Sequence, residues 1–227
     1  MHLVKKILII FFFLIPFSNL FAAMVTQIDK RTFNDPGSAD KMGTVQFNDD
    51  GTKMFLTFHN GLNNTAAHRS DDKINEYTLS VPYDISTATY AGNDERCSVV
   101  DPDHSSSHQS TGATLGFKFA DDGMKIFTMQ RGLNDKQTSF VNRLDLTTAY
   151  DISTCTYHSD VDVDTNALQN GTNIGDRSTE DNNNLQGMFI TNDGTKMFLT
   201  MNERETGNPQ SIKQYSLSTP YDLSTLT

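Results

Sequence analysis

NDDGTKMFLTF, residues 48–58, is the stretch that decides the fold, because most of it recurs as ADDGMKIFTM at residues 120–129 and as TNDGTKMFLTM at residues 191–201. In each copy an Asp-Gly pair separates two short apolar segments, and this pair favours the positive φ angles of a two-residue β-hairpin turn. The segment after the turn is apolar at almost every position, which is typical of a strand covered on both faces. The sequence therefore predicts one antiparallel β unit, repeated three times at intervals of about seventy residues.

A second pattern follows each hairpin: INEYTLSVPYDIST at 74–87, VNRLDLTTAYDIST at 141–154 and IKQYSLSTPYDLST at 212–225. Its first half alternates apolar and polar residues, which predicts a third strand with period two. Its second half predicts a tight turn, in which the aspartate side chain bonds nearby backbone N–H groups. A fourth strand is expected at 88–90 in the first copy and at 155–163 in the second. Four antiparallel strands per repeat, joined by tight turns, describe the blade of a β-propeller.

The sequence DGTKMF followed by INEYTLSVPYDISTAT resembles the tandem repeats of bacterial and phage β-propellers of the YVTN and lactonase-like group, over roughly residues 40–227. The resemblance implies an all-β fold, a β-propeller of four-stranded antiparallel blades, with three blade repeats at about 41–100, 111–163 and 185–227. The group includes lactonases, dehydrogenase-like proteins and many members without a known activity. The resemblance therefore implies a fold and assigns no catalytic residue.

Three blades are fewer than the four to eight of typical closed propellers. The third copy stops at YDLSTLT, where its fourth strand is expected to begin. Residues 23–40 precede the first copy, and we expect VTQIDKRTF at 25–33 to be a displaced fourth strand, of the kind that completes the last blade. Either the chain is a portion of a larger, partial propeller, or three-blade halves assemble into a closed six-bladed ring.

Residues 1–22 are predicted to be a signal peptide, because Lys5 and Lys6 precede the apolar run ILIIFFFLIPF and small residues follow it. The alternative is a retained anchor helix, although the run is short for a membrane span and contains Pro16. We expect a secreted or periplasmic protein with no membrane association after cleavage. Cys97 and Cys155 are the only cysteines, and an oxidising compartment allows a disulfide between them, although sequence alone cannot place their Cα atoms.

The chain is acidic, with a formal net charge of −10, and loss of the two leader lysines makes it more so. Phosphate backbones and anionic lipid surfaces repel such a chain, so nucleic acid is not expected as a partner. The acidic residues are interspersed with Asn, Ser, Thr and Gly, which is also what the solubility of an exported protein requires.

Long loops are predicted on one side of the repeat array. Because the strands of a blade alternate in direction, the connection after the second strand shares a side with the connection after the fourth, and both tight turns lie opposite. The loops on this long-loop face are expected at 60–72, 92–112, 131–139, 164–184 and 202–211. Insertions gathered on one side of a repeat array usually mark its working surface, although tolerated insertions produce the same pattern.

Three groups of side chains in these loops are candidates for binding. The loops that follow the three second strands begin with polar residues that differ from copy to copy: His59, Arg131, Asn202, Glu203 and Arg204. A ring of such residues suits a small polar ligand, such as a sugar or an organic acid, or else forms a solvated rim. DPDHSSSH carries metal-donor types in a serine-rich loop: Asp101, Asp103, His104 and His108. DVDVDTN suggests a calcium loop but departs from the EF-hand pattern, because Thr165 stands at its glycine position and Gly171 at its glutamate position; its acids are Asp160, Asp162 and Asp164.

No cofactor is evident beyond this calcium hypothesis, and G-x-S-x-G, H-E-x-x-H and a phosphate-binding glycine loop are all absent from the sequence. Whether the protein is an enzyme is left open, with a non-enzyme favoured. The sequence best fits an exported binding or interaction module that uses its long-loop face for a small polar ligand or a protein. One alternative is a lactonase-like or sugar-dehydrogenase-like enzyme with a site at the central channel. The other is a structural component of an extracellular or virion assembly.

Overall fold

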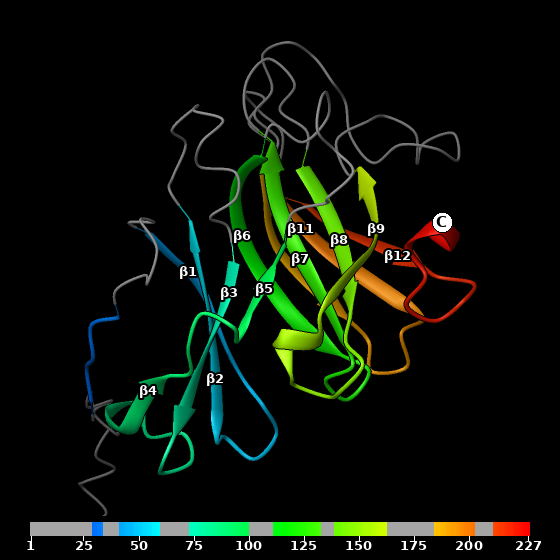
Figure 1. Cartoon of the computed structure of the whole chain (residues 1–227). Helices are drawn as coiled ribbons and strands as arrows, with labels where there is room; N and C mark the ends of the chain where they lie inside the picture. Colours follow the sequence, from blue (N-terminus) through cyan, green and yellow to red (C-terminus); the bar gives the residue numbers. More distant parts are fainter. Residues whose placement is uncertain are drawn as a thin grey trace, which may run out of the picture. The chain divides into compact units, whose positions relative to one another are not determined.

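The computed structural model describes residues 29–33, 41–59, 73–99, 111–132, 139–162, 184–202 and 211–227 (Figure 1). The chain divides into two units, Met1–Lys30 and Arg31–Thr227, and only the last two residues of the first unit are described. The predicted signal peptide therefore lies outside the described residues. Within the described ranges, no helix is long and apolar enough to cross a membrane.

The first sheet contains β1 (Lys41–Phe47), β2 (Lys53–His59), β3 (Lys73–Leu79), β4 (Ala88–Tyr90) and β5 (Arg96–Ser98). The strands are antiparallel in the order β1-β2-β3-β4, and β5 also pairs with β3. The strands β4 and β5 together fill the place of a fourth strand, which an excursion at residues 91–95 interrupts. The prediction of an uninterrupted loop at 92–112 is wrong in this respect, because Arg96–Ser98 pair with Lys73–Asn75.

The second and third sheets repeat this plan. The second is β6 (Thr111–Ala120), β7 (Lys125–Gly132), β8 (Ser139–Asp145) and β9 (Thr156–Asp162), and the third is β10 (Asn184–Ile190), β11 (Lys196–Asn202) and β12 (Ser211–Ser216), all antiparallel and in sequence order. A short 3-10 helix follows each third strand: η2 (Ile85–Thr87), η3 (Ile152–Thr154) and η4 (Leu223–Thr225). Beside β12, Leu217 bridges to Leu226 where the other sheets have a fourth strand. The all-β, antiparallel prediction is confirmed, and none of the described sheets closes on itself.

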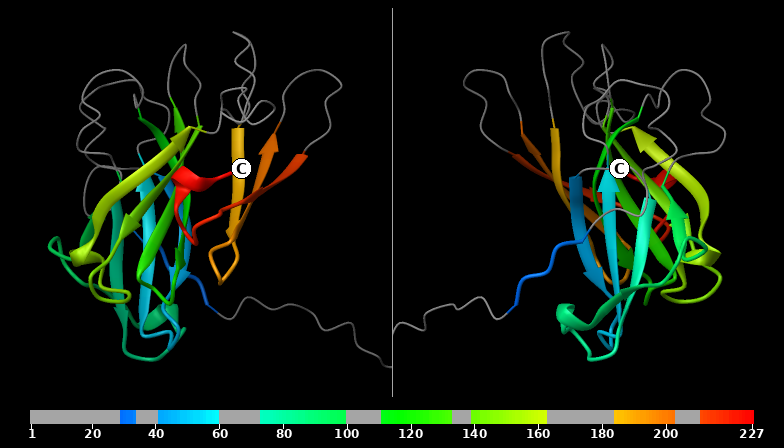
Figure 2. Two further views of the ribbon diagram at one scale, coloured as in Figure 1. Left: turned by 90° about the vertical axis from the view of Figure 1, so that its right-hand side faces the viewer. Right: turned by 60° about the vertical axis from the view of Figure 1, so that its left-hand side comes forward.

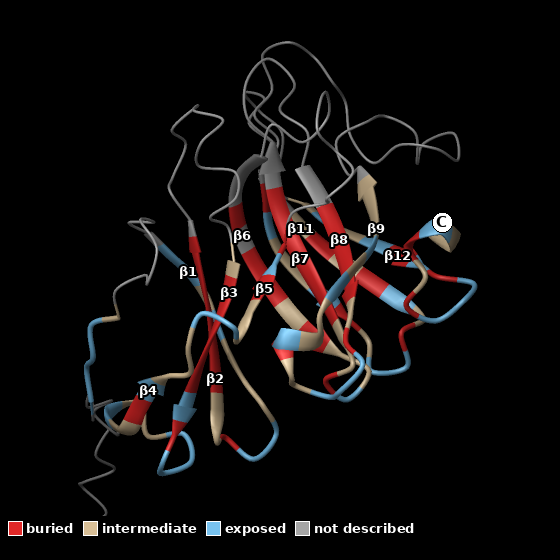
Figure 3. Ribbon diagram, in the orientation of Figure 1, coloured by how far each residue is buried: buried red, intermediate tan, exposed pale blue. Residues whose placement is uncertain are grey.

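Each sheet has two faces, which we name from its second strand. The leading face is the side that carries Met54, Ile126 or Met197, and the trailing face carries the next residue, Phe55, Phe127 or Phe198. Phe55 and Ile74 of the first trailing face share a core cluster with Ile126 of the second leading face. Phe127 of the second trailing face shares another with Met197 of the third leading face. The sheets therefore stack in chain order, and the apolar segments of β2 and β7 are buried on both sides (Figure 3).

A pair of turns closes the same end of every sheet. The tyrosine of each third-strand turn has a positive φ (59° at Tyr83, 56° at Tyr150) and donates its backbone N–H to the glycine of the Asp-Gly turn. Its ring covers that glycine so closely that a Cβ on Gly51 or Gly123 would lie 2.4 Å from ring carbons. Tyr221 and Gly194 repeat the arrangement in the third sheet. We call this end the locked end.

The Asp-Gly turns are longer than predicted. The backbone N–H of Asn48 donates to the carbonyl oxygen of Lys53 at 3.2 Å, and the N–H of Lys53 donates to Asn48 Oδ1 at 2.9 Å, so the turn between β1 and β2 has four residues instead of two. In the first and third of these turns an aspartate side chain accepts hydrogen bonds from neighbouring threonines. In the third sheet, Asp193 accepts bonds from Thr191 and Thr195, and these hydrogen bonds lower the pKa of Asp193 to about 2.

The other ends of the second strands lie together, away from the locked end. β2, β7 and β11 all run toward this end, as both views in Figure 2 show. We call it the open end, and it corresponds to the predicted long-loop face. The strand β6 lies next to both β1 and β10, so the first strands of the three repeats adjoin one another.

Residues 29–33 form no strand, and the remainder of the displaced fourth strand predicted at 25–33 lies outside the described residues. Arg31 Nη1 donates to the carbonyl oxygens of Ile85 (3.2 Å) and Ser86 (2.9 Å), and the ring of Phe33 meets Tyr77 edge-on at 5.1 Å. Arg31 and Phe33 therefore contact the first sheet through their side chains. Residues 23–28 lie outside the described part of the chain.

Candidate functional site

The predicted ligand residues lie at the open end. His59, Arg131 and Asn202 occupy equivalent positions at or next to the ends of β2, β7 and β11, paired with Lys41, Ser139 and Asn184 respectively. The structure describes their backbones but not their side chains, and Glu203 and Arg204 lie outside the described residues. The strands therefore bring three of the five candidates to the same end of neighbouring sheets.

Most of the predicted metal residues fall outside the described residues: Asp101, Asp103, His104, His108 and Asp164. Asp160 is described, and its Oδ1 accepts a hydrogen bond of 2.8 Å from the hydroxyl of Tyr157. Asp162 pairs with Phe140 through the backbone. No group of three His, Cys, Asp or Glu side chains converges as metal ligands in the described ranges. The metal hypotheses stay predictions.

Cys97 and Cys155 form a disulfide between the first and second sheets, with their Cα atoms 5.8 Å apart. Cys97 belongs to β5, and Cys155 directly precedes β9. The bond lies in the apolar cluster between the sheets, where Cys97 is fully buried. Sequence reasoning allowed this bond but could not place it, because β5 was not predicted.

Buried polar side chains lie between the first and second sheets, close to the open end. Gln130 Nε2 and Asn142 Nδ2 both donate to the carbonyl oxygen of Val99, at 2.7 and 3.1 Å. Thr128 lies opposite Asn142 in the ladder, on the same leading face. All three side chains are essentially fully buried. Their remaining oxygens, Thr128 Oγ1, Gln130 Oε1 and Asn142 Oδ1, have no hydrogen-bond partner.

We call these three side chains the seam acceptors. Leaving a buried acceptor unpaired costs about 1–3 kcal/mol, so such groups in a native protein usually serve a bound water, ion or ligand. Two amide oxygens and a hydroxyl oxygen suit a hydrogen-bond donor or a cation that prefers oxygen ligands. Gln130 directly precedes Arg131, which connects the seam acceptors to the predicted ligand residues.

Sequence reasoning missed the seam acceptors, although the repeat contains a signal for them. The positions of Thr128 and Gln130 are occupied by Leu56 and Phe58 in the first copy, and by leucine and methionine in the third. Polar residues in a strand that is apolar in the other two copies distinguish the interface between the first and second sheets.

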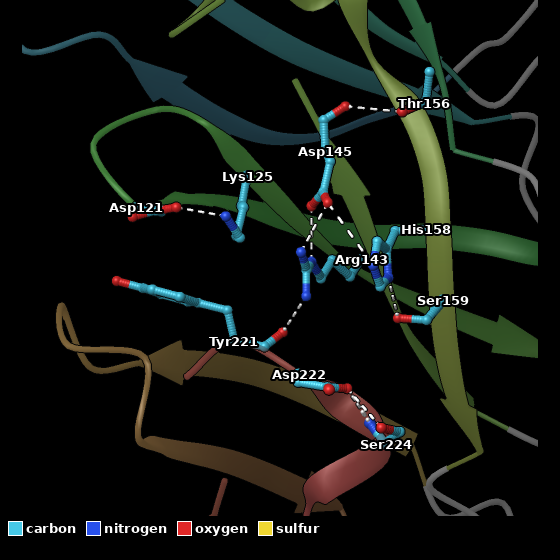
Figure 4. A network of polar contacts seen from close by, with 10 residues as sticks. All are labelled: Asp121, Lys125, Arg143, Asp145, Thr156, His158, Ser159, Tyr221, Asp222 and Ser224. Atoms are coloured by element: carbon cyan, nitrogen blue, oxygen red, sulfur yellow. Dashed lines mark hydrogen bonds and ion pairs between the residues drawn. The ribbon is translucent and has the colours of Figure 1, made fainter. Parts of the chain in front are cut away.

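A second polar network lies between the second and third sheets, toward the locked end (Figure 4). Arg143 makes two hydrogen bonds of 2.7 Å to Asp145 and donates through Nη1 to the carbonyl oxygen of Tyr221 at 3.0 Å. Lys125 pairs with Asp121 and lies 5.4 Å from the centre of the Tyr221 ring. These cations already have partners, so the network acts as a clamp between two sheets.

A charged pair occupies the corresponding place between the first and second sheets. Lys53 Nζ lies 2.9 Å from Glu76 and donates to the carbonyl oxygen of Tyr150 at 3.1 Å. Burial raises the pKa of the Glu76 carboxyl, and its second oxygen has no hydrogen-bond partner. Because Lys53 compensates this carboxylate, the pair also holds neighbouring sheets together.

No family model matches the chain, and no curated protein matches it either.

Proposed function

We propose that this protein is an exported binding module, built from consecutive blades of a β-propeller, that takes a polar ligand at the open end. The observation that carries this proposal is the contrast between the two ends of the sheets. The locked end repeats the same glycine and tyrosine in every sheet, whereas the open end carries unlike residues, His59, Arg131 and Asn202, at equivalent positions. Repetition is typical of a scaffold, and variation on one side of a repeat array is typical of recognition.

Three further observations support the blade arrangement and the export. Successive sheets pack with the same pair of faces, as blades do. The first strands of the repeats adjoin one another, as do the inner strands around a propeller axis. The disulfide fits an oxidising compartment, and the signal peptide predicted at residues 1–22 fits export to one.

The seam acceptors indicate the chemistry of the ligand. Their oxygens are buried and need donors, so a ligand rich in hydroxyl or amine groups satisfies them if its binding opens the seam at the open end, whereas the net charge of −10 disfavours a polyanion. A neutral sugar or a hydroxylated small molecule meets both conditions. We therefore propose that the ligand lies between the first and second sheets at the open end, near Gln130 of β7 and the end of β2 at His59.

Isothermal titration of the purified protein with a panel of neutral mono- and oligosaccharides tests this proposal. Arg131→Ala and His59→Ala are each expected to weaken binding about tenfold, which corresponds to 1.4 kcal/mol. Thr89→Ala is the control, because Thr89 is exposed on β4, outside the open end. Equal affinities for the wild type and for both open-end variants would contradict the proposal, as would the absence of binding across the panel.

A further inference from the structure

The trailing face of the third sheet is exposed, although its equivalents in the other two sheets are buried. Ile212 on this face is 72% exposed, whereas Ile74 and Val141, at the equivalent ladder positions, are 0% exposed. Figure 3 shows the same contrast between β8, which is mostly buried, and β12. The same position is thus buried by the following sheet in the first two repeats and exposed in the third. Its exposure arises because none of the described sheets follows the third one, and not from a preference of the residue for water.

The exposed position belongs to an apolar patch. Phe198 lies on the same face, and its equivalents Phe55 and Phe127 are fully buried. Phe189, which pairs with Phe198 across the ladder, is 50% exposed, and the two rings lie 6.2 Å apart. We call Phe189, Phe198 and Ile212 the third-sheet patch. Contiguous exposed apolar side chains on a folded protein usually mark an interaction surface.

Polar contacts also repeat at each seam. Across the first seam Lys53 donates to the carbonyl oxygen of Tyr150, and across the second seam Arg143 donates to that of Tyr221. In both cases a cation on the trailing face reaches the turn tyrosine of the next sheet. A sheet that follows the third sheet is expected to offer a tyrosine turn of the same kind.

The donors and the acceptor for a third such contact are present in the chain. Lys196 and Gln214 occupy the positions of Lys53 and Arg143 on the third sheet, and both are exposed. Tyr83, the turn tyrosine of the first sheet, is 57% exposed. It is the one turn tyrosine of the three described sheets that has no preceding sheet beside it.

We propose that the trailing face of the third sheet docks on the leading face of the first sheet in a second copy of this chain. The contact continues the interface that the chain already forms twice, between its first and second and its second and third sheets. The receiving face is apolar and is exposed at Val45 on β1 and at Tyr83 in the turn, whereas Met54, Leu56 and Phe58 on β2 are already buried within one copy. Docking therefore has to displace the contacts that bury β2 in one copy, among them the packing of Phe33 at Tyr77. Since each copy has one donor face and one receiving face, two copies form two such contacts when the arrangement closes.

The molecular mass of the purified protein in solution, measured by light scattering after size exclusion, tests this inference. The wild type is expected at the mass of two copies. Ile212→Lys places a charge in the third-sheet patch and Val45→Lys places one on the receiving face, so each variant alone is expected at the mass of one copy. Thr89→Lys is the matched control, because Thr89 is exposed on β4 and belongs neither to the third-sheet patch nor to the receiving face, and it keeps the wild-type mass.

The two variants also distinguish the proposed occupant from another one. If third-sheet patches pair with each other, Val45→Lys leaves the mass at two copies, and the proposal is overturned. A wild type that stays at the mass of one copy up to its solubility limit overturns it as well. An equimolar mixture of the two variants is expected to regain the mass of two copies, because one intact donor face meets one intact receiving face. All three substitutions are at exposed positions, and unchanged thermal melting of one-copy variants shows that they fold.

Discussion

Replacing Gly123 by alanine tests the glycine-tyrosine contact of the locked end. Gly123 has a φ of 86°, and a Cβ there would lie 2.4 and 2.5 Å from two ring carbons of Tyr150. Carbon atoms normally approach to about 3.5–4.0 Å, so the ring must move by more than 1 Å. That movement breaks the Tyr150 N–H bond to Gly123 O at 3.0 Å and the hydroxyl bond to Asp49 at 2.8 Å.

The expected loss of stability follows from these contacts. Two hydrogen bonds contribute about 1 kcal/mol each, and a non-glycine residue at positive φ costs about 1–2 kcal/mol. Gly123→Ala is therefore expected to lower the free energy of unfolding by about 3–4 kcal/mol, which at this chain length lowers the melting temperature by roughly 6–16 °C.

Urea unfolding followed by circular dichroism measures the change, and Gly92→Ala is the matched control. Gly92 also has a positive φ, of 128°, but a Cβ there meets no atom within 4 Å. Its loss is expected to be limited to the backbone penalty, and the difference between the two variants isolates the ring contact. Equal losses for Gly92→Ala and Gly123→Ala would refute the reasoning.

Three further predictions concern the disulfide, the acid limb of stability and the seam acceptors. Reduction, or Cys97→Ser with Cys155→Ser, opens a loop of 58 residues and is expected to lower stability by about 4 kcal/mol; unchanged urea midpoints with and without reductant would contradict this. Hydrogen bonds hold the pKa of Asp193 at about 2, below its ordinary 3.8, so its contribution is present above pH 3.8 and is lost as the pH falls toward 2. In thermal melts at a series of pH values, Asp193→Asn is expected to reduce the fall in melting temperature between pH 3.8 and 2. An equal fall in the variant and the wild type would contradict this. Thr128→Val removes an unpaired buried hydroxyl, so it is expected to leave the melting temperature unchanged or raise it while weakening sugar binding. Gln130→Met, which introduces the residue of the third repeat, is expected to change both quantities in the same direction. A large drop in melting temperature for both variants would contradict the assignment of these side chains as seam acceptors.

The central hairpins could be predicted from the sequence, because local and global signals agree there. The repeated DG pair specifies a reversal, and Met54–Phe58 specify a strand buried on both faces, which the structure confirms. The order of strands within a sheet follows from the short connections. These features depend on residues that are close in the sequence, where pattern and propensity are most informative.

Features that depend on side-chain bonds between distant residues could not be predicted. The four-residue length of the Asp-Gly turns is shared by the turn at 121–124, where Met124 replaces the threonine that bonds Asp50 in the first turn, so the local sequence does not reveal it. The strand at Arg96–Ser98 forms because Arg96 bonds Asn75 across the ladder, twenty-one residues away in the chain. The path of Arg31 and Phe33 is decided by η2 and Tyr77, which the sequence does not place beside them.

The candidate site was only partly predictable. Equivalent positions of His59, Arg131 and Asn202 follow from the repeat, since they end the same strand in each copy. The seam acceptors instead require the knowledge that the leading face of the second sheet meets the first sheet near Val99. An aligned comparison of the three copies reveals the polar substitutions, but it does not show that the resulting oxygens lack partners.

The similarity of the stacking faces also has a consequence for folding fidelity. Phe55, Phe127 and Phe198 present equivalent apolar side chains on the three trailing faces. Hydrophobic burial alone therefore does not specify which sheet packs on which. The seams differ in their specific bonds, the disulfide at the first and the clamp of Arg143 on Tyr221 at the second. These bonds favour the native pair of neighbouring sheets over other pairs. A chain without them is expected to skip a repeat or exchange a sheet with another molecule more often, while losing little of its apolar burial.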